Sequence, residues 1–157
     1  MLIDINKDGR KDIVAGNDRR GNELYWIEAP ENPKEQWKVH LIDKEFYKYH
    51  DQAYGDVDGD GKRELIILTQ KGRKLMVYDI PGKPEIGPWT RELRNIVADG
   101  IEVEGVSAVD VDRDGIMDIV VGGYWFKNVK GCTNRWIKYQ FSSFKKTKLA
   151  AGDINND

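Results

Sequence analysis

The sequence contains little of what marks several common classes of protein. Its one cysteine, Cys132, excludes an internal disulfide framework and leaves a thiolate metal site without a second ligand. The longest apolar runs, such as Ile119-Val120-Val121, are far shorter than the roughly 20 residues of a membrane-spanning helix. The formal net charge is −2, which provides no general attraction to nucleic acid or to a membrane surface. The sequence therefore predicts neither a membrane span nor a nucleic-acid partner.

The first residues also lack the pattern of a secretory signal peptide, because Met1-Leu2-Ile3 runs directly into acidic residues. The composition is that of a globular protein, with 39% hydrophobic and 33% charged residues in a chain of 157. Five tryptophans and seven tyrosines are many for this length, and aromatic side chains are enriched in strands. The composition thus predicts one folded domain that is rich in β-structure.

A nine-residue acidic motif repeats along the chain. It reads Asp-x-Asp/Asn-x-Asp-Gly-x-x-Asp/Glu, and it begins at Asp4, Asp56 and Asp110. A fourth copy begins at Asp153, and the sequence stops within it. Self-similarity at a nearly fixed period indicates a repeat architecture in which each repeat is one structural unit.

The segments around each motif repeat as well, and each has the features of a short strand. In order they are an apolar run after the motif (12–16, 64–68, 118–122), an aromatic run (24–27, 75–78, 124–126), a run that opens with tryptophan (37–41, 89–93, 136–141) and a run of small residues before the next motif (53–56, 106–110, 149–153). No segment has a convincing helical period. Four antiparallel strands in each repeat predict an all-β fold of β-propeller blades.

The predicted blade boundaries follow from these runs. A blade with three strands spans residues 1–45, complete blades span 46–98 and 99–144, and the first strand of a further blade spans 145–157. About three blades are too few for a ring, because propellers have roughly four to eight. We therefore expect an excerpt of a larger propeller of about seven blades, or a ring that several copies complete. The predicted partners are the remaining blades or another copy of the chain.

The repeated motif has the ligand pattern of a calcium site. Calcium binds six to eight oxygen atoms, and side chains at positions 1, 3, 5 and 9 supply oxygens while the backbone carbonyl of position 7 adds one. The predicted ligands are Asp4, Asn6, Asp8, Arg10 and Asp12 in the first loop; Asp56, Asp58, Asp60, Lys62 and Glu64 in the second; Asp110, Asp112, Asp114, Ile116 and Asp118 in the third; and Asp153, Asn155 and Asp157 in the fourth.

The motif has two other interpretations, as a turn without a metal and as a site for a different metal. An exposed turn can be rich in Asp and Gly without binding a metal, but that would not explain three complete copies at equivalent places. Zinc is disfavoured because the loops contain no Cys or His, and magnesium prefers a stricter octahedron. The sequence therefore predicts calcium as the cofactor, in three complete sites and a fourth that the chain end cuts. Its expected role is mainly structural, because binding would offset the repulsion among clustered carboxylates.

At residues 53–66 and 108–123 the sequence resembles the FG-GAP/VCBS repeat family, whose calcium-loop blades are similar to those of the integrin-α N-terminal propeller. The resemblance implies a β-propeller in an extracellular or periplasmic protein that binds carbohydrate or protein. Other members are sugar-acting lyases and dehydratases, so part of an enzyme and a purely structural module are alternatives. The Phe-Gly pair that names the repeat is missing here. The aromatic pattern Leu24-Tyr25-Trp26-Ile27 looks more like that of bacterial secreted VCBS proteins and dehydratase-type propellers than like that of integrins.

Two residues outside the motifs are candidates for a catalytic or sugar-binding role. His50 and Glu104 each lie six residues before a motif, where the innermost strand of a blade begins. Facing a central channel, they would be placed to act as acid and base. The simpler interpretation is that they are polar residues at the channel rim. The five tryptophans are expected to pack between blades rather than to stack on sugars.

Overall fold

The computed structural model describes residues 1–17, 21–143 and 147–152, and these residues form three antiparallel sheets of four strands each. The first sheet contains β1 (Leu2–Ile3), β2 (Asp12–Gly16), β3 (Leu24–Glu28) and β4 (Lys38–Asp43). The second contains β5 (Tyr49–Gly55), β6 (Glu64–Thr69), β7 (Lys74–Tyr78) and β8 (Arg94–Asp99), with the short 3-10 helix η1 (Arg91–Leu93) before β8. The third contains β9 (Val106–Val109), β10 (Asp118–Val121), β11 (Tyr124–Asn128) and β12 (Trp136–Gln140).

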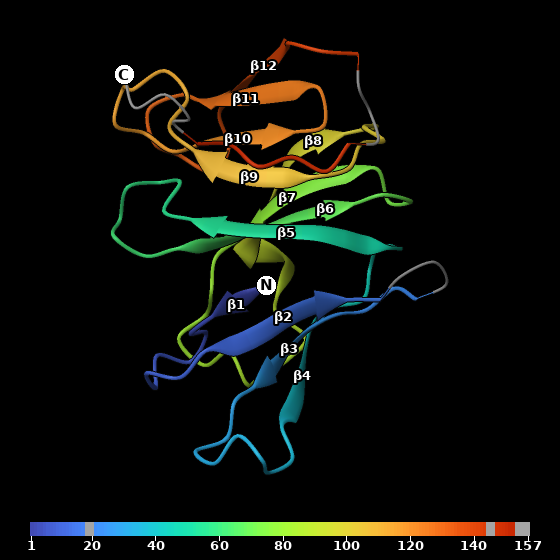
Figure 1. Ribbon diagram of the computed structural model, residues 1–157, viewed down its shortest axis with the longest axis vertical. Coiled ribbons are helices and arrows are strands. Elements are labelled where there is room, and N and C mark those ends of the chain that lie inside the picture. The colour runs from blue at the N-terminus through green and yellow to red at the C-terminus, as the bar shows by residue number, and fades with distance from the viewer. Residues whose placement is uncertain (18–20, 144–146, 153–157) are drawn as a thin grey trace.

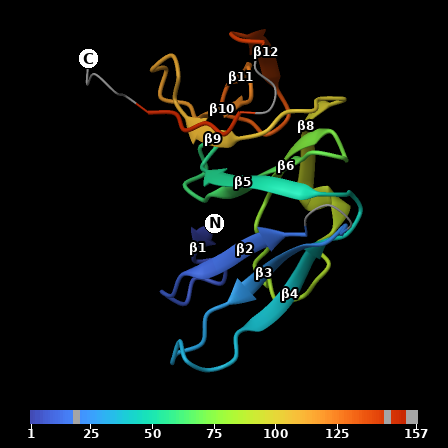
Figure 2. The same ribbon diagram turned by 45° about the vertical axis from the view of Figure 1, so that its right-hand side comes forward.

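Each sheet is a meander, since its strands are neighbours in the order in which the chain forms them. The sheets are stacked along the long axis, with the second between the other two (Figure 1). The first strands of the second and third sheets, β5 and β9, lie against each other, and β2 lies on the other side of β5 (Figures 1 and 2). This is the arrangement of consecutive propeller blades, although the described strands do not close a ring.

The middle sheet is buried on both faces, which explains its continuous apolar sequence. All six residues of β6 are buried. Because side chains alternate along a strand, Leu65 and Ile67 pack with the first sheet while Ile66 and Leu68 pack with the third. The strand β7 divides its side chains in the same way between the two clusters. The second blade therefore supplies one face to each of the two hydrophobic cores.

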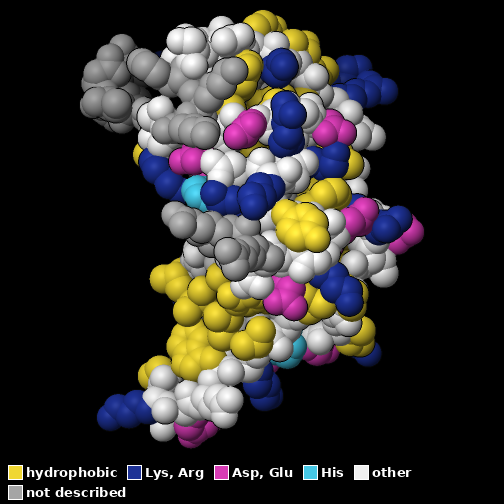
Figure 3. All heavy atoms as spheres, turned by 90° about the vertical axis from the view of Figure 1, so that its right-hand side faces the viewer, with side chains coloured by type: hydrophobic (Ala, Val, Ile, Leu, Met, Phe, Trp, Pro, Cys, Tyr) yellow, Lys and Arg dark blue, Asp and Glu magenta, His cyan; other side chains and the backbone are white. Residues whose placement is uncertain are grey.

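The first and third sheets have a neighbouring sheet on one face only among the residues that the structure describes. Their last strands are accordingly exposed, and Val39, Ile137 and Tyr139 keep 65%, 46% and 45% of their surface accessible. Figure 3 shows hydrophobic side chains gathered on the lower part of the molecule, at the height of the first sheet. Both ends of the stack thus have the character of surfaces that a further blade could cover.

A buried polar junction joins the first and second sheets. The Asp43 carboxylate, at the end of β4, accepts hydrogen bonds from the Tyr78 hydroxyl and from Nη1 of Arg94, both at 2.7 Å. Burial raises the pKa of Asp43, but the bonds from Tyr78, the Glu45 amide and Arg94 outweigh it and leave that pKa below its ordinary value. Every one of these partners stabilises the charged carboxylate, so the junction behaves as a fixed ion pair.

The predicted all-β fold is confirmed, and the strands differ from the predicted ones at both ends of the chain. The first sheet has four strands rather than three, because Leu2–Ile3 pairs with β2. At the other end, residues 147–152 form no strand, whereas the sequence predicted one over 145–157. The rest of that predicted strand lies outside the described residues.

The outer strand of the second blade was also predicted at the wrong place. It was expected over 89–93, but β8 begins at Arg94. Trp89 is instead an anchor: its backbone amide donates to the Ile42 carbonyl at 2.8 Å and its indole to the Pro84 carbonyl at 3.0 Å. Because the amide is bonded to the first sheet, it cannot join the ladder of the second, and the chain makes one 3-10 turn before pairing begins.

Candidate metal centres

The three complete acidic motifs form loops at the same place in each sheet, between its first and second strands. Each loop has two residues in the left-handed backbone region, at positions 4 and 6. These are Lys7 and Gly9, Gly59 and Gly61, and Arg113 and Gly115. A Cβ atom at any of the four glycines would meet nothing within 4 Å, so the turn requires glycine for its backbone angles and not for space. All three motifs have glycine at position 6, whereas at position 4 only the second loop has glycine.

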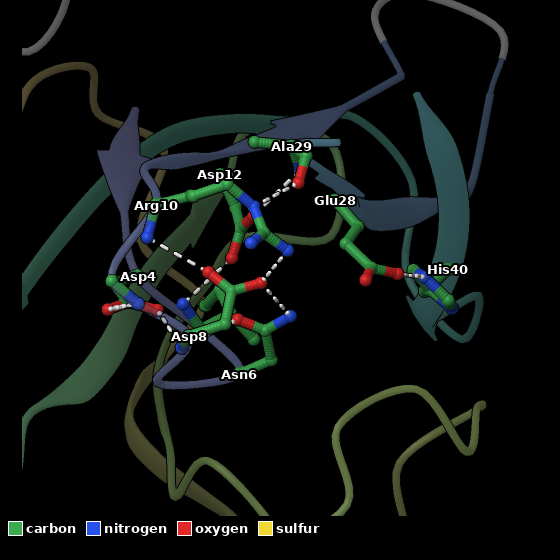
Figure 4. Close-up of polar contacts among 10 residues, drawn as sticks. Asp4, Asn6, Asp8, Arg10, Asp12, Glu28, Ala29 and His40 are labelled. Carbon is green, nitrogen blue, oxygen red and sulfur yellow. Dashed lines mark hydrogen bonds and ion pairs between the residues drawn. The ribbon is translucent and has the colours of Figure 1, made fainter. Parts of the chain in front are cut away.

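The carboxylate of position 1 organises each loop. In the first loop Asp4 accepts the amide of Asp8 at 3.1 Å and that of Gly9 at 3.0 Å (Figure 4). Asp56 accepts the amides of Gly59 and Gly61 at 2.7 and 2.9 Å. In the third loop Asp110 accepts those of Asp114 and Gly115 at 3.2 and 2.8 Å. The loops therefore hold their acidic side chains on one side of a tight turn.

The carboxylate of position 9 is buried in every loop. Asp12, Glu64 and Asp118 expose 0%, 3% and 0% of their surface, and each accepts the backbone amide of position 2. Such a carboxylate is costly unless it is paired or bound to a cation. The pKa of Glu64 is raised to about 7, mainly by burial and in smaller part by the charges of Asp58, Asp56 and Asp79. Burial likewise raises the pKa of Asp12.

Oxygen atoms converge in the second and third loops. Single carboxylate oxygens of Asp56, Asp58 and Glu64 lie within 4.8 Å of one another. The same holds for Asp110, Asp112 and Asp118. The ligand set is all oxygen, with a buried acid at one side, which fits a hard cation such as calcium and does not fit zinc. These clusters could hold a metal ion.

A basic side chain lies on the position 5 carboxylate of each loop. In the first loop Nη2 of Arg10 and Nδ2 of Asn6 both donate to Oδ2 of Asp8 (Figure 4). In the second, Nζ of Lys62 donates to Oδ2 of Asp60 at 2.6 Å. In the third, the base comes from outside the loop: Nζ of Lys127, on β11, donates to Asp114 at 2.6 Å and also to Asp112. Partial neutralisation of the loop charge is thus common to all three.

The metal-binding roles of the position 7 residues and of the fourth loop stay predictions. The backbone amides of Arg10, Lys62 and Ile116 donate to the position 5 carboxylates at 2.7–3.0 Å, and a metal-binding role for their carbonyl oxygens stays a prediction. The fourth loop, with Asp153, Asn155 and Asp157, lies outside the described residues.

The two candidate residues near the innermost strands belong to contacts between the second and third blades. Nδ1 of His50 lies 2.8 Å from Oδ2 of Asp51, and that same oxygen accepts the Gly105 amide. Glu104 accepts a bond from Nε2 of Gln70 on the second blade. Within the described part of the chain no hydrogen bond joins His50 to Glu104, so their joint role in chemistry stays a prediction.

The tryptophans divide into two groups. Trp26 and Trp89 are buried in the core between the first two sheets, and Trp136 packs against the core between the second and third. These three fit the expected packing between blades. Trp125 instead stacks on Tyr139 and donates from its indole to Asp118 at 2.9 Å. Trp37 belongs to neither core, and its indole donates to the Pro33 carbonyl.

A model of FG-GAP-like repeats matches residues 4–67 and 56–121, so each match begins at the first residue of an acidic loop. The chain belongs to the FG-GAP-like repeat family. The two FG-GAP matches overlap at the second loop and end within β6 and at the end of β10. The comparison with curated proteins gives no match, and neither does that with solved structures. The described residues include no helix with the length and apolar character needed to cross a membrane.

Sequence reasoning missed two residues that face the loops, Asp79 and Lys127. Asp79 directly follows β7 and Lys127 lies near the end of β11. Each is one step beyond a strand pair, Leu65 with Tyr78 and Ile119 with Phe126. That register sets both opposite the position 9 acid. Aligning the charged residue at the end of each aromatic strand with the loop acid would have revealed them.

Proposed function

We propose that this chain is a calcium-binding module of β-propeller blades, in which each of the three complete loops binds one Ca²⁺ and calcium holds the blades in their folded arrangement. The observation that carries the proposal is the buried acid at position 9. In the second loop Glu64 is buried within 4.8 Å of two other carboxylates, where a cation would relieve both burial and repulsion. With three divalent ions bound, the formal charge would change from −2 to +4.

The chain's own groups prepare each loop for a cation. Backbone amides fix both oxygens of the position 1 carboxylate, and the position 9 side chain is locked by burial and by the amide of position 2. The ligands therefore lose little conformational freedom on binding. Calcium would supply positive charge at the point where the first two strands of a blade diverge, and so connect the folding of the blade to the metal.

Calorimetric titration of calcium tests this proposal with the variant Asp58→Ala. The wild-type protein is expected to bind three calcium ions, and the variant two, because the second loop loses a carboxylate from its cluster. Asp99→Ala is the matched control, since Asp99 is an exposed acid of the same blade that pairs with Lys74. Absence of binding by the wild type would refute the proposal. Unchanged stoichiometry in Asp58→Ala would refute the assignment of Asp58 alone.

We further propose that the module is part of a closed propeller in an extracellular or periplasmic protein that binds carbohydrate or protein. The exposed Val39, Ile137 and Tyr139 at the two ends of the stack support the ring, because further blades or another copy would cover them. Calcium sites that are exposed on extracellular modules have dissociation constants of roughly 10⁻⁴–10⁻³ M, which suits a calcium-rich compartment. Sedimentation of the purified chain tests whether copies associate.

A further inference from the structure

One residue position in each blade lies directly opposite the buried loop acid. The strand registers pair Ile13 with Ile27, Leu65 with Tyr78 and Ile119 with Phe126. One step further along each pair of strands, the position 9 acids face residues at or next to the end of the third strand. These residues are Glu28 in the first blade, Asp79 in the second and Lys127 in the third. The three blades therefore place an acid, an acid and a base at equivalent points beside equivalent loops.

In the second blade this position adds an acidic group to the loop. Asp79 is half-buried, and within residues 1–17, 21–143 and 147–152 its carboxylate has no hydrogen bond or ion pair. Asp79 lines the same pocket as Asp58, Asp60 and Glu64, so its carboxylate lies beside the ligands of this loop. Glu64 can also accept a further partner, since only its Oε2 accepts a hydrogen bond from the described residues. This loop also has glycine at both left-handed positions.

In the third blade the equivalent position already supplies a cation. The Lys127 ammonium donates to both Asp112 and Asp114. The buried acid of this loop is also fully used: Oδ2 of Asp118 accepts from Val111 and Trp125, and Oδ1 accepts the Asn128 amide. A calcium ion entering this loop would have to displace the ammonium from two of its ligands.

The first blade lies between these extremes. Glu28 points away from its loop, and its Oε2 lies 2.8 Å from Nε2 of His40 (Figure 4). The base on this loop is Arg10, which belongs to the loop itself and is tied by Nε to the Ala29 carbonyl. Neither an added acid nor a lysine from the neighbouring strand changes the charge of this loop.

We propose that the strand residue opposite the loop acid sets the calcium affinity of each blade, so that Asp79 makes the second loop the tightest site and Lys127, as a tethered competing cation, makes the third the weakest. The proposal rests on the proposed function, because it concerns the order in which the same loops fill. As calcium rises, the second loop binds first, and the third binds last with release of the Lys127 ammonium. The module then responds to calcium over a wider range of concentration than three equal sites would.

Nitrogen-15 NMR of the 157-residue chain during a calcium titration tests the order of filling. The amides of Gly61 and Gly115 each donate to the first carboxylate of their own loop, so their cross-peaks report the second and third sites separately. In the wild type the Gly61 peak is expected to reach its bound position at lower calcium than the Gly115 peak. The reverse order would overturn the proposal.

Two substitutions of Lys127 separate its charge from its packing. Lys127→Gln is expected to lower the calcium concentration at the midpoint of the Gly115 shift by about tenfold, because the positive charge that competes for two ligands is removed. Lys127→Arg keeps the charge and is expected to leave the transition near its wild-type midpoint. Lys138→Gln removes a positive charge from the same blade where the lysine lies over the Tyr124 ring, and it measures the general effect of charge. A shift in Lys127→Gln no larger than that in Lys138→Gln would overturn the role of Lys127.

Asp79→Asn tests the other half of the proposal. It is expected to raise the calcium concentration at the midpoint of the Gly61 shift by about tenfold, while the Gly115 midpoint stays unchanged. An unchanged Gly61 midpoint would overturn the role of Asp79. If neither glycine peak responds to calcium in the wild type, the proposed function itself fails. A response of both peaks with unaltered midpoints in the variants would refute only the inference.

Discussion

Removal of calcium with EGTA at pH 8 is expected to lower the Tm of this protein by at least about 10 °C relative to the protein in excess calcium. A ligand at about 100 times its Kd adds roughly 2.7 kcal/mol to the stability of the state that binds it. For a protein of this size, 1 kcal/mol corresponds to about 2–4 °C in Tm. Two loaded loops are enough for the expected loss, which thermal melting followed by circular dichroism measures.

The size of the loss should depend on pH because of Glu64. In the calcium-free protein its pKa is raised from 4.5 to about 7, first by burial and then by the neighbouring carboxylates. A raised pKa in the folded state gives stability that is complete below pH 4.5 and is lost as the pH rises through 7. The difference is worth about 3 kcal/mol across that range. The calcium-free protein should therefore melt at a lower temperature at pH 8 than at pH 5.

Calcium binding to the ionised Glu64 carboxylate should remove this part of the pH dependence. The variant Glu64→Gln is the control: it has no charge to bury at this position, so in EGTA its Tm should differ less between pH 5 and pH 8 than that of the wild type. Equal Tm values with and without calcium at pH 8 would contradict the stabilising role of the metal. A calcium-free Tm that rises between pH 5 and pH 8 would contradict the raised pKa of Glu64.

Much of this structure could be predicted from sequence because the repeated features have local causes. The motif Asp56-Val-Asp58-Gly-Asp60-Gly61 dictates a tight turn whose amides bond the first carboxylate, and the structure contains that turn in three blades. The run Leu65-Ile66-Ile67-Leu68 is apolar at every position, which requires a strand buried on both faces. Both inferences use only residues that lie within a few positions of one another.

The features that escaped prediction depend on contacts between distant segments. Trp89 resembles Trp37 and Trp136 in sequence, but its amide bonds Ile42 in the preceding blade, and so the strand begins five residues later. Lys127 is an ordinary surface lysine by composition. Its position opposite the third loop follows from the register of β10 and β11, and only then does it become a partner of Asp112 and Asp114.

The replacement Asp43→Ala is expected to reduce the free energy of unfolding by about 2–3 kcal/mol, measured by urea denaturation in excess calcium. Asp43 is the shared acceptor for the Tyr78 hydroxyl and the Arg94 guanidinium, and the side chains of Asp43 and Arg94 are only 11% and 9% exposed. Without the carboxylate, the buried Tyr78 hydroxyl loses its acceptor, and the Arg94 guanidinium keeps only its ion pair with Glu45 at 2.8 Å. Because these groups lie on different blades, the loss falls on the interface between the first and second sheets.

The double variant Asp43→Ala with Arg94→Met separates the ion pair from its burial. Removing both side chains leaves no guanidinium in the junction that has lost one of its two carboxylates, so this protein should be more stable than Asp43→Ala alone. Asp99→Ala removes half of an exposed pair with Lys74 and should change stability little. In a stack of repeats each blade is stabilised mainly through its neighbours, so weakening this junction should let the first blade unfold before the others and broaden the urea transition. A sharp transition with wild-type stability would mean that the hydrophobic contacts of Trp26, Ile42 and Leu65 alone hold the two blades together.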